Sequence, residues 1–140
     1  MGIEWYRNEM PISYEDQITI EKSPQYFVRD QAPYRIFKYN STICLILIVK
    51  EPVERTLSEY AHHKLNWEPG IKKGELIPFE KEVFNSSGGV NTQNVNVYKS
   101  IYWPYLQHYL EFFQRDQILV VDGDEFVQYP LPVIQKVEKF

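Results

Sequence analysis

The sequence predicts an α/β fold in which helices flank a central parallel sheet. An apolar run at residues 43–49 has no alternating polar residue, and its β-branched content and short length favour a strand buried on both faces. A helix-period pattern follows this run, and a second predicted strand precedes it at 18–22. Strand, helix and strand in succession imply a right-handed crossover and parallel pairing. With 140 residues, 44% of them hydrophobic, the chain can bury the core of one modest domain.

The N-terminal part contains helical segments on both sides of the first predicted strand. Residues 3–10 are aromatic and charged and predict a short helix that ends before Pro11. Residues 18–22 alternate between apolar and polar side chains, as a half-buried strand does, and Pro24 ends that strand. Residues 26–39 predict the helix and turn that lead to the next strand.

The stretch at 42–60 predicts a strand, a tight turn and a helix. Pro52 is suited to the first helical position, because proline is best tolerated in the first turn. Apolar residues then recur every four positions and predict the buried stripe of this helix, at Val53, Leu57, Ala61 and Leu65. In open α/β sheets, ligands gather at the carboxyl ends of strands, where helix N-termini offer free N–H groups to anions.

Basic and hydroxyl side chains at this turn suit a phosphate group. Lys50 follows the strand, and Arg55 and Ser58 lie three residues apart on one face of the helix. Lys22 ends the preceding predicted strand, so parallel pairing would direct both lysines into one crevice. Taken alone, the same residues are more typical of a solvated surface, and that alternative stays open.

Residues 66–99 are the least regular part of the sequence. A loop of this length in a compact domain is usually functional or disordered, and its place after the candidate phosphate helix suits a lid over a ligand. Residues 100–113 then predict a helix, provided that it starts near Trp103, because Pro104 would kink it if it started much earlier.

The C-terminal part predicts one more strand and one more helix. Residues 117–121 are a short apolar run, and Asp122-Gly123-Asp124 after it is more typical of a turn than of a metal site, since a calcium loop needs further ligands. Residues 131–140 predict the last helix, after Pro130.

Composition and missing motifs exclude several classes of function. The net charge of −4 gives no global attraction to nucleic acid, and no apolar run is long enough to span a membrane. Residues 1–5 lack the basic start and apolar core of a signal peptide. Cys44 is predicted to be an inert buried thiol, and no internal disulfide can form. The sequence has no zinc-site histidine spacing, Walker loop or dinucleotide glycine fingerprint.

Two segments together resemble a known enzyme family. Residues 18–27 and 47–60 are similar to the corresponding parts of the heparan sulfate glucosamine 3-O-sulfotransferases, and the likeness is strongest to the type 1 and type 5 branch. The resemblance runs nearly end to end, because further stretches fit the same family at 2–7, 90–92, 100–102, 121–124 and 130–132.

The resemblance implies a P-loop-kinase-like α/β domain. It also implies transfer of a sulfuryl group from 3′-phosphoadenosine 5′-phosphosulfate (PAPS) to the 3-hydroxyl of a glucosamine in heparan sulfate, with no metal. Such enzymes work in the Golgi lumen, which agrees with two N-glycosylation sequons at Asn40 and Asn85. The implied partners are PAPS and heparan sulfate rather than nucleic acid. Attachment to a membrane would need an anchor N-terminal to this chain.

The resemblance also implies roles for individual residues. Lys50 and Ser58 match the residues that hold the 3′-phosphate of PAPS, and Lys22 matches a catalytic lysine near the transferred group. The residues implied to contact the acceptor sugar are Lys22, Ser23, Pro24 and Gln25, with a second contact at Asn94 and Val95.

Three departures from the family pattern qualify these roles. Lys50 replaces the usual arginine, which keeps the charge but loses the bidentate fork. Asn94 and Val95 replace an aromatic residue and a polar or basic one. The family's glycine-rich 5′-phosphosulfate loop, its glutamate general base, its C-terminal disulfide and its last PAPS loop have no counterpart in residues 1–140.

These departures lead to the expectation that residues 1–140 are an interior part of a sulfotransferase domain and have no transfer activity alone. The alternatives are a non-catalytic paralogue or binding protein that keeps the α/β sheet, and an unrelated nucleotide-binding domain. Saccharide preference, oligomeric state and use of the sequons do not follow from the sequence.

Overall fold

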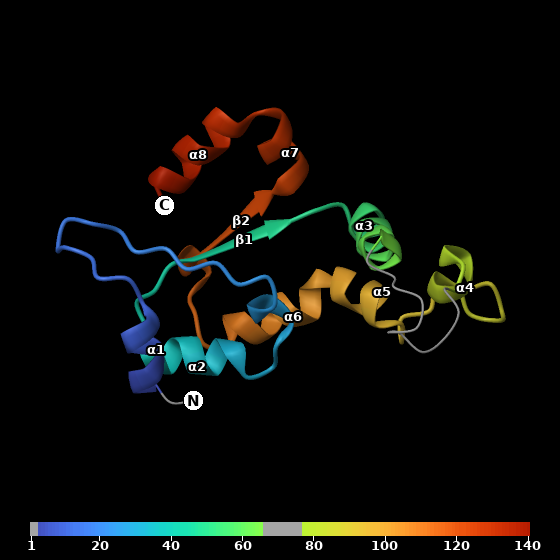
Figure 1. Cartoon of the computed structure of the whole chain (residues 1–140), viewed down its shortest axis with the longest axis horizontal. Helices are drawn as coiled ribbons and strands as arrows, with labels where there is room; N and C mark the ends of the chain where they lie inside the picture. The colour runs from blue at the N-terminus through green and yellow to red at the C-terminus, as the bar shows by residue number, and fades with distance from the viewer. Residues whose placement is uncertain (1–2, 66–76) are drawn as a thin grey trace.

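The computed structural model describes residues 3–65 and 77–140. Its two strands are β1 (Leu45–Val49) and β2 (Ile118–Asp122). The helices, drawn in Figure 1, are α1 (Ile3–Glu9), the 3₁₀ turn η1 (Tyr26–Val28), α2 (Ala32–Tyr39), α3 (Pro52–Leu65), α4 (Phe79–Val83), α5 (Val95–Ser100), α6 (Tyr102–Leu110), the 3₁₀ turn η2 (Arg115–Gln117), α7 (Gly123–Gln128) and α8 (Pro130–Glu138).

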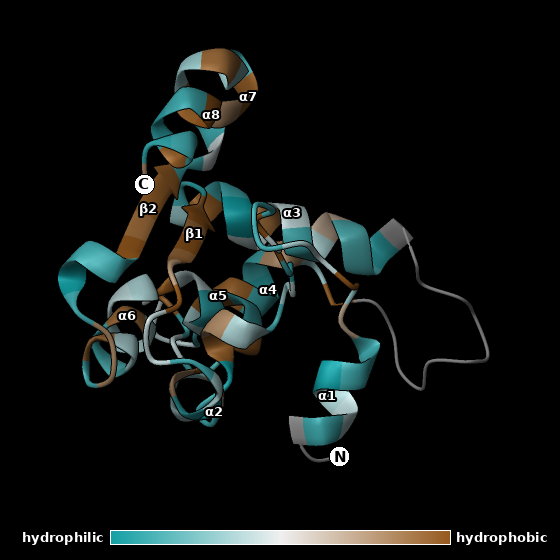
Figure 2. Cartoon of the chain, turned by 90° about the vertical axis from the view of Figure 1, so that its left-hand side faces the viewer, coloured by the Kyte–Doolittle hydropathy of each residue, from teal (hydrophilic) through white to brown (hydrophobic). Residues whose placement is uncertain are grey.

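The two strands pair in parallel, from Leu45 opposite Ile118 to Val49 opposite Asp122. Figures 1 and 2 show α7 and α8 on one side of this sheet and α2 and α6 on the other. The predicted α/β class with a parallel sheet flanked by helices is therefore confirmed. The strands at 43–49 and 117–121 are confirmed within one or two residues at their ends.

The predicted strand at 18–22 is wrong, and so is its parallel pairing with β1. This segment has no regular secondary structure, and Ile18 and Ile20 are 89% and 74% exposed. Alternation indicates only that one side of a segment could be buried, whereas a strand also needs a neighbour for its backbone hydrogen bonds. Among the described residues, β1 takes β2 as its neighbour, and the sheet contains these two strands.

The prediction that β1 is buried on both faces is also wrong. Leu45 packs against the core, whereas Ile46 and Ile48 point to the other face and are 42% and 55% exposed. Cys44 is exposed, so the predicted burial of its thiol is wrong as well. Figure 2 shows that both strands are hydrophobic along their length, although burial alternates along β1.

The core lies where α6 meets the start of β2. Its centre is Tyr109, Phe113 and Ile118, each at most 6% exposed. Tyr109 and Phe113 lie four residues apart, as the helix prediction for 100–113 requires, although the helix itself ends at Leu110. Pro104 is the third residue of α6, where its missing N–H would have had no partner in the helix.

Helix α3 begins at Pro52 as predicted, but the face that it buries differs from the prediction. Val53 and Leu57 are 66% and 49% exposed, whereas Thr56 is only 6% exposed. The reason is that α3 packs against α5, which presents polar partners to it. The predicted apolar stripe at Val53, Leu57 and Ala61 is consequently not the buried one.

The region predicted to be irregular contains α4 and most of α5, so that prediction is wrong for residues 79–83 and 95–99. Residues 66–76, the first part of the predicted lid, lie outside the described residues. The predicted turn at 122–124 is the start of α7, because the Asp122 carboxylate accepts from the N–H groups of Asp124 and Glu125 at 2.8 and 3.2 Å. The predicted C-terminal helix is confirmed as α8.

Candidate functional site at the end of the parallel sheet

Lys50 directly follows β1 and is flanked by two carboxylates. Its ammonium lies 3.2 Å from Glu54 Oε2 and 3.9 Å from Asp124 Oδ1. The hydrogen bond to Glu54 raises the pKa of Lys50 above its ordinary value, so the side chain is charged near neutral pH. The Lys50 side chain is 42% exposed, and exposed ion pairs of this kind contribute little free energy. An incoming anion can therefore compete with both carboxylates for the ammonium.

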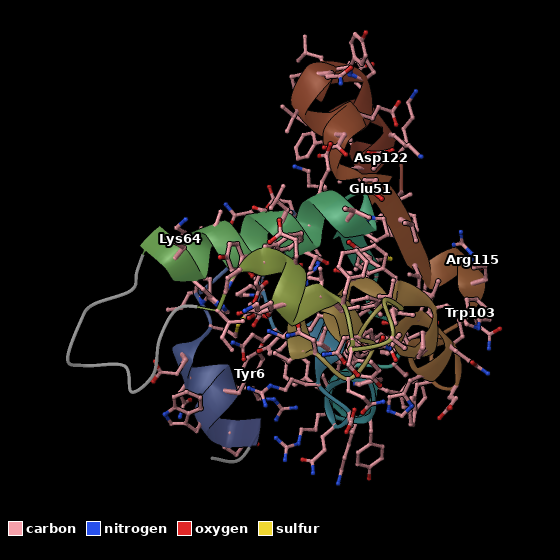
Figure 3. The ribbon with its side chains drawn as sticks, turned by 90° about the vertical axis from the view of Figure 1, so that its right-hand side faces the viewer. Tyr6, Glu51, Lys64, Trp103, Arg115 and Asp122 are labelled. Atoms are coloured by element: carbon pink, nitrogen blue, oxygen red, sulfur yellow. The ribbon has the colours of Figure 1, made fainter. Side chains whose placement is uncertain are left out.

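Asp124 reaches Lys50 because α7 starts very close to the end of β1. A Cβ on Gly123 would lie 2.8 Å from the carbonyl oxygen of Val49. Glycine is thus required here for space, since a side chain would force the two segments apart. Figure 3 shows Glu51 and Asp122 near each other at this edge of the sheet. Sequence analysis missed Glu54 and Asp124 as neighbours of Lys50. The spacing of four residues between Lys50 and Glu54 was a usable signal, whereas Asp124 reaches Lys50 only through the pairing of β1 with β2.

Ser58 and Arg55 do not share one environment on α3. Ser58 is exposed, as a ligand-binding hydroxyl requires. Arg55 is half-buried, with Nε 2.6 Å from Ser100 Oγ and Nη1 2.8 Å from Glu59 Oε2, and Nη2 bonds to the carbonyl of Asn96. Each of its three nitrogens has a protein acceptor. Arg55 is thus engaged in the contact between α3 and α5, and its part in a phosphate site stays a prediction.

Glu59 is the centre of the polar contact between α3 and α5. It accepts from Arg55 and, at 3.2 Å, from Lys99 Nζ. Burial acts to raise the pKa of Glu59, but the hydrogen bonds from Lys99 and Arg55 outweigh it and hold this pKa below its ordinary value. The buried hydroxyls of Thr56 and Ser100, 2.7 Å apart, complete the contact. The two helices are thus joined by charged and hydroxyl groups rather than by an apolar stripe.

Lys22 to Gln25 form an exposed segment that is held at both ends. Before it, Glu21 Oε2 accepts from the Tyr6 hydroxyl at 3.3 Å. After it, the carbonyl of Tyr26 accepts from the Tyr109 hydroxyl at 2.9 Å. Within the segment, Lys22, Pro24 and Gln25 are exposed and Ser23 is half-buried, and Gln25 accepts from Arg29 at 2.8 Å.

The crevice predicted for Lys22 and Lys50 depended on parallel pairing of two strands, and that basis is lost because residues 18–22 form no strand. No ion pair or side-chain hydrogen bond of Lys22 occurs in the part of the chain that the structure describes. Tyr102 instead links η1, which follows Lys22, to the end of β1. Its ring centroid lies 6.3 Å from that of Phe27 in η1, and its hydroxyl donates to the carbonyl of Lys50 at 2.8 Å.

Asn94 and Val95 lie at the start of α5. Asn94 caps this helix, because its Oδ1 accepts from the N–H groups of Asn96 and Val97 at 2.9 and 3.3 Å. Val95 is 57% exposed, on the rim of an open depression of about 370 Å³ that Thr92, Gln93, Val95 and Tyr98 line. The Asn94 side chain therefore stabilises the start of α5, whereas the Val95 side chain is exposed and accessible to a ligand.

The described residues contain neither a candidate metal site nor a candidate membrane-spanning helix. Outside 1–2 and 66–76, no three His, Cys, Asp or Glu side chains gather in a way that could hold a metal ion. Over the same residues, no helix is long and apolar enough to cross a membrane.

A family model described as "Sulfotransferase domain" matches residues 1–140. The chain belongs to the sulfotransferase domain family. Among curated relatives of this sulfotransferase domain, heparan sulfate glucosamine 3-O-sulfotransferase 5 of Homo sapiens is 46% identical over 140 residues, which cover 99% of this chain and 40% of the relative. Heparan sulfate glucosamine 3-O-sulfotransferase 3B1 of Homo sapiens is 34% identical over 139 residues, covering 99% of the chain and 35% of the relative.

The chain thus spans about two fifths of the length of the first of these relatives. Among solved structures, the crystal structure of a sulfotransferase from Alicyclobacillus acidocaldarius matches with a TM-score of 0.63 and 19% identity, covering 82% of this chain and 46% of that one. The predicted P-loop-kinase-like sulfotransferase fold and the resemblance to the 3-O-sulfotransferases are both confirmed. The segments predicted to be missing from the domain, and the roles of the individual site residues, stay predictions.

Proposed function

We propose that this chain is part of a heparan sulfate glucosamine 3-O-sulfotransferase, which moves a sulfuryl group from PAPS to the 3-hydroxyl of a glucosamine. The observation that carries the proposal is the 46% identity to a relative of that name over 99% of the chain. The arrangement at the end of β1 supports it, because a charged lysine and the first turn of α3 lie where an α/β sheet binds anions, and an exposed serine follows on the same helix.

In this proposal, Lys50 and Ser58 hold the 3′-phosphate of PAPS. Lys50 is charged and partly exposed, and Ser58 is exposed, so both groups fit an anion in their chemistry. PAPS would supply the sulfuryl group and its 5′-phosphate leaving group. Lysine acts on the 3′-phosphate as a single point charge, since it lacks the two-pronged geometry of arginine.

Lys22 is the proposed catalytic residue. During transfer, the acceptor oxygen forms a bond to sulfur while the bond from sulfur to the leaving phosphate oxygen breaks. Negative charge then grows on that phosphate oxygen, and a lysine ammonium nearby would stabilise it. The acceptor proton goes to a carboxylate base, which the family resemblance places before residue 1. The attachment of Glu21 to Tyr6 and of Tyr26 to Tyr109 restricts the segment that carries Lys22, and such restriction favours alignment.

The acceptor heparan sulfate is proposed to contact Lys22, Ser23, Pro24 and Gln25, and also Asn94 and Val95. Because Oδ1 of Asn94 caps α5, only its amide nitrogen is left to bond a sugar hydroxyl. We place the protein in the Golgi lumen and propose N-glycans at Asn40 and Asn85, which are both exposed and both belong to sequons.

The test is transfer of labelled sulfate from PAPS to heparan sulfate by the full-length protein in which this sequence occurs. Disaccharide analysis of the product should find the label on the 3-oxygen of glucosamine. Lys22→Ala should abolish transfer, and Lys50→Ala should raise the KM for PAPS, whereas the exposed Lys136→Ala on α8 is the matched control. Absence of any PAPS-dependent transfer by the wild type would overturn the proposal and favour a non-catalytic paralogue.

A further inference from the structure

We propose that Tyr102 is a positioning residue that fixes Lys50 for binding of the 3′-phosphate, an inference that rests on the phosphate role proposed for Lys50. The Tyr102 hydroxyl donates to the carbonyl of Lys50 at 2.8 Å. The same hydroxyl accepts from the N–H of Lys50 at 3.4 Å. One side chain therefore engages both backbone polar groups of this lysine.

Lys50 needs such a partner because the sheet no longer holds it. The paired register of β1 and β2 ends at Val49 and Asp122, one residue before Lys50. Beyond the last pair, backbone groups must find other partners or water. Tyr102 supplies them from the first residue of α6, which is 52 positions away in the sequence. The position of the Lys50 Cα, from which its long side chain extends, is thus set by α6.

Tyr102 is itself connected to the segment that carries Lys22. Its ring centroid lies 6.3 Å from that of Phe27 in η1. Phe27 also packs against Tyr105 and Tyr109 of α6, with centroids 5.5 and 5.8 Å away. Tyr102 therefore contacts both the end of β1 and the element that follows Lys22, so it relates the proposed phosphate cation to the proposed catalytic segment.

The hydroxyl and the ring of Tyr102 can be separated by one substitution. Tyr102→Phe removes only the oxygen and keeps the packing on Phe27, so the end of β1 loosens while η1 stays attached. We expect the affinity for 3′-phosphoadenosine 5′-phosphate to fall about fivefold, the effect of one net hydrogen bond. Affinity for 5′-AMP, which lacks the 3′-phosphate, should change less than about twofold, because the hydroxyl that is removed bonds the backbone of Lys50.

The experiment is calorimetric titration of the full-length protein with these two nucleotides. Tyr34→Phe is the matched control, since Tyr34 is half-exposed and packs on Phe112 at a centroid distance of 6.0 Å, away from Lys50. In a Lys50→Ala background, Tyr102→Phe should cause no further loss. A KM for PAPS that rises in Tyr102→Phe, with the KM for heparan sulfate unchanged, would agree.

The outcomes distinguish failure of the positioning role of Tyr102 from failure of the phosphate role of Lys50. If wild-type protein does not prefer the 3′-phosphorylated nucleotide, the phosphate role of Lys50 is wrong and the positioning role falls with it. If wild type prefers that nucleotide and Lys50→Ala removes the preference, but Tyr102→Phe keeps it, only the inference is overturned. Equal weakening of both nucleotides by Tyr102→Phe would show a general structural effect and would also overturn it.

Discussion

Replacement of Gly123 by alanine is expected to destabilise the protein, against the general trend for glycine in helices. Gly123 is the first residue of α7, and it has no positive φ, so conformational freedom does not explain it. Its Cβ in the alanine variant would lie 2.8 Å from the carbonyl oxygen of Val49 and 3.4 Å from Ile48 Cγ2. A backbone oxygen in a paired strand cannot move alone, so β1 or α7 must shift.

The expected magnitude is the difference between two opposing effects. Forcing one methyl group into a packed contact costs about 1–3 kcal/mol. The alanine gains up to about 1 kcal/mol, because it restricts the unfolded chain and favours helix. The midpoints of these two ranges give a net loss of unfolding free energy of about 1.5 kcal/mol. Because Val49 precedes Lys50, the same shift should also weaken binding of 3′-phosphoadenosine 5′-phosphate.

Urea unfolding followed by far-ultraviolet circular dichroism measures this difference. Lys136→Ala is the control, since Lys136 is exposed on α8 and its replacement adds no atom to a packed contact. That variant should stay within about 0.5 kcal/mol of the wild type. A Gly123→Ala protein as stable as the wild type, or more stable, would refute the close-approach argument.

Three further predictions concern the helices around the site. Arg55→Lys should lower the unfolding free energy by about 1–3 kcal/mol, because lysine cannot bond Ser100, Glu59 and the Asn96 carbonyl together; an unchanged urea midpoint would contradict this. Asn94→Ala should cost about 1 kcal/mol and Asn94→Ser much less, since serine caps equally well, and urea midpoints will compare them. The hydrogen bond to the Asp30 carbonyl, followed by that to Glu111, raises the pKa of His108 above its ordinary value of 6.5. The stability that protonated His108 contributes is complete below its unfolded-state pKa and is lost as pH rises through its higher folded-state pKa. When melting is followed against pH between these two pKa values, the wild type should therefore lose more stability than His108→Gln.

The elements that sequence alone predicted correctly are those whose signal is local. The run that became β1, the proline that opens α3 and the last helix after Pro130 each carry their own information in a few adjacent residues. Residues 18–22 have a local pattern too, but strand formation depends on a neighbour, and no pattern within five residues specifies one. The buried face of α3 was wrong for a related reason, since the partner of Thr56 is Ser100, 44 positions away.

In the candidate site, too, features with a local sequence signal were predicted and features that depend on long-range contacts were not. The order of Lys50, Pro52 and Ser58 in the sequence was enough to predict a basic strand end followed by a helix that carries a hydroxyl group. The carboxylate of Asp124 could be placed beside Lys50 only once β2 was known to pair with β1. The hydroxyl of Tyr102 requires in addition the docking of α6, so long-range contacts account for what the sequence did not predict.

Lys50 and Arg55 show why spacing on a helix does not by itself identify an anion site. Both are cations near the start of α3, and both have carboxylate partners. The Lys50 side chain is 42% exposed and its partners are also exposed, so its ammonium can exchange them for a phosphate at little cost. The Arg55 side chain is 21% exposed and bonds three groups, two of them on α5, so releasing it would break three hydrogen bonds, two of which join α3 to α5. A cation binds a ligand only if the free energy lost with its protein partners is smaller than the free energy gained from the ligand. By that condition Lys50, which precedes α3, is better suited to an anion than Arg55.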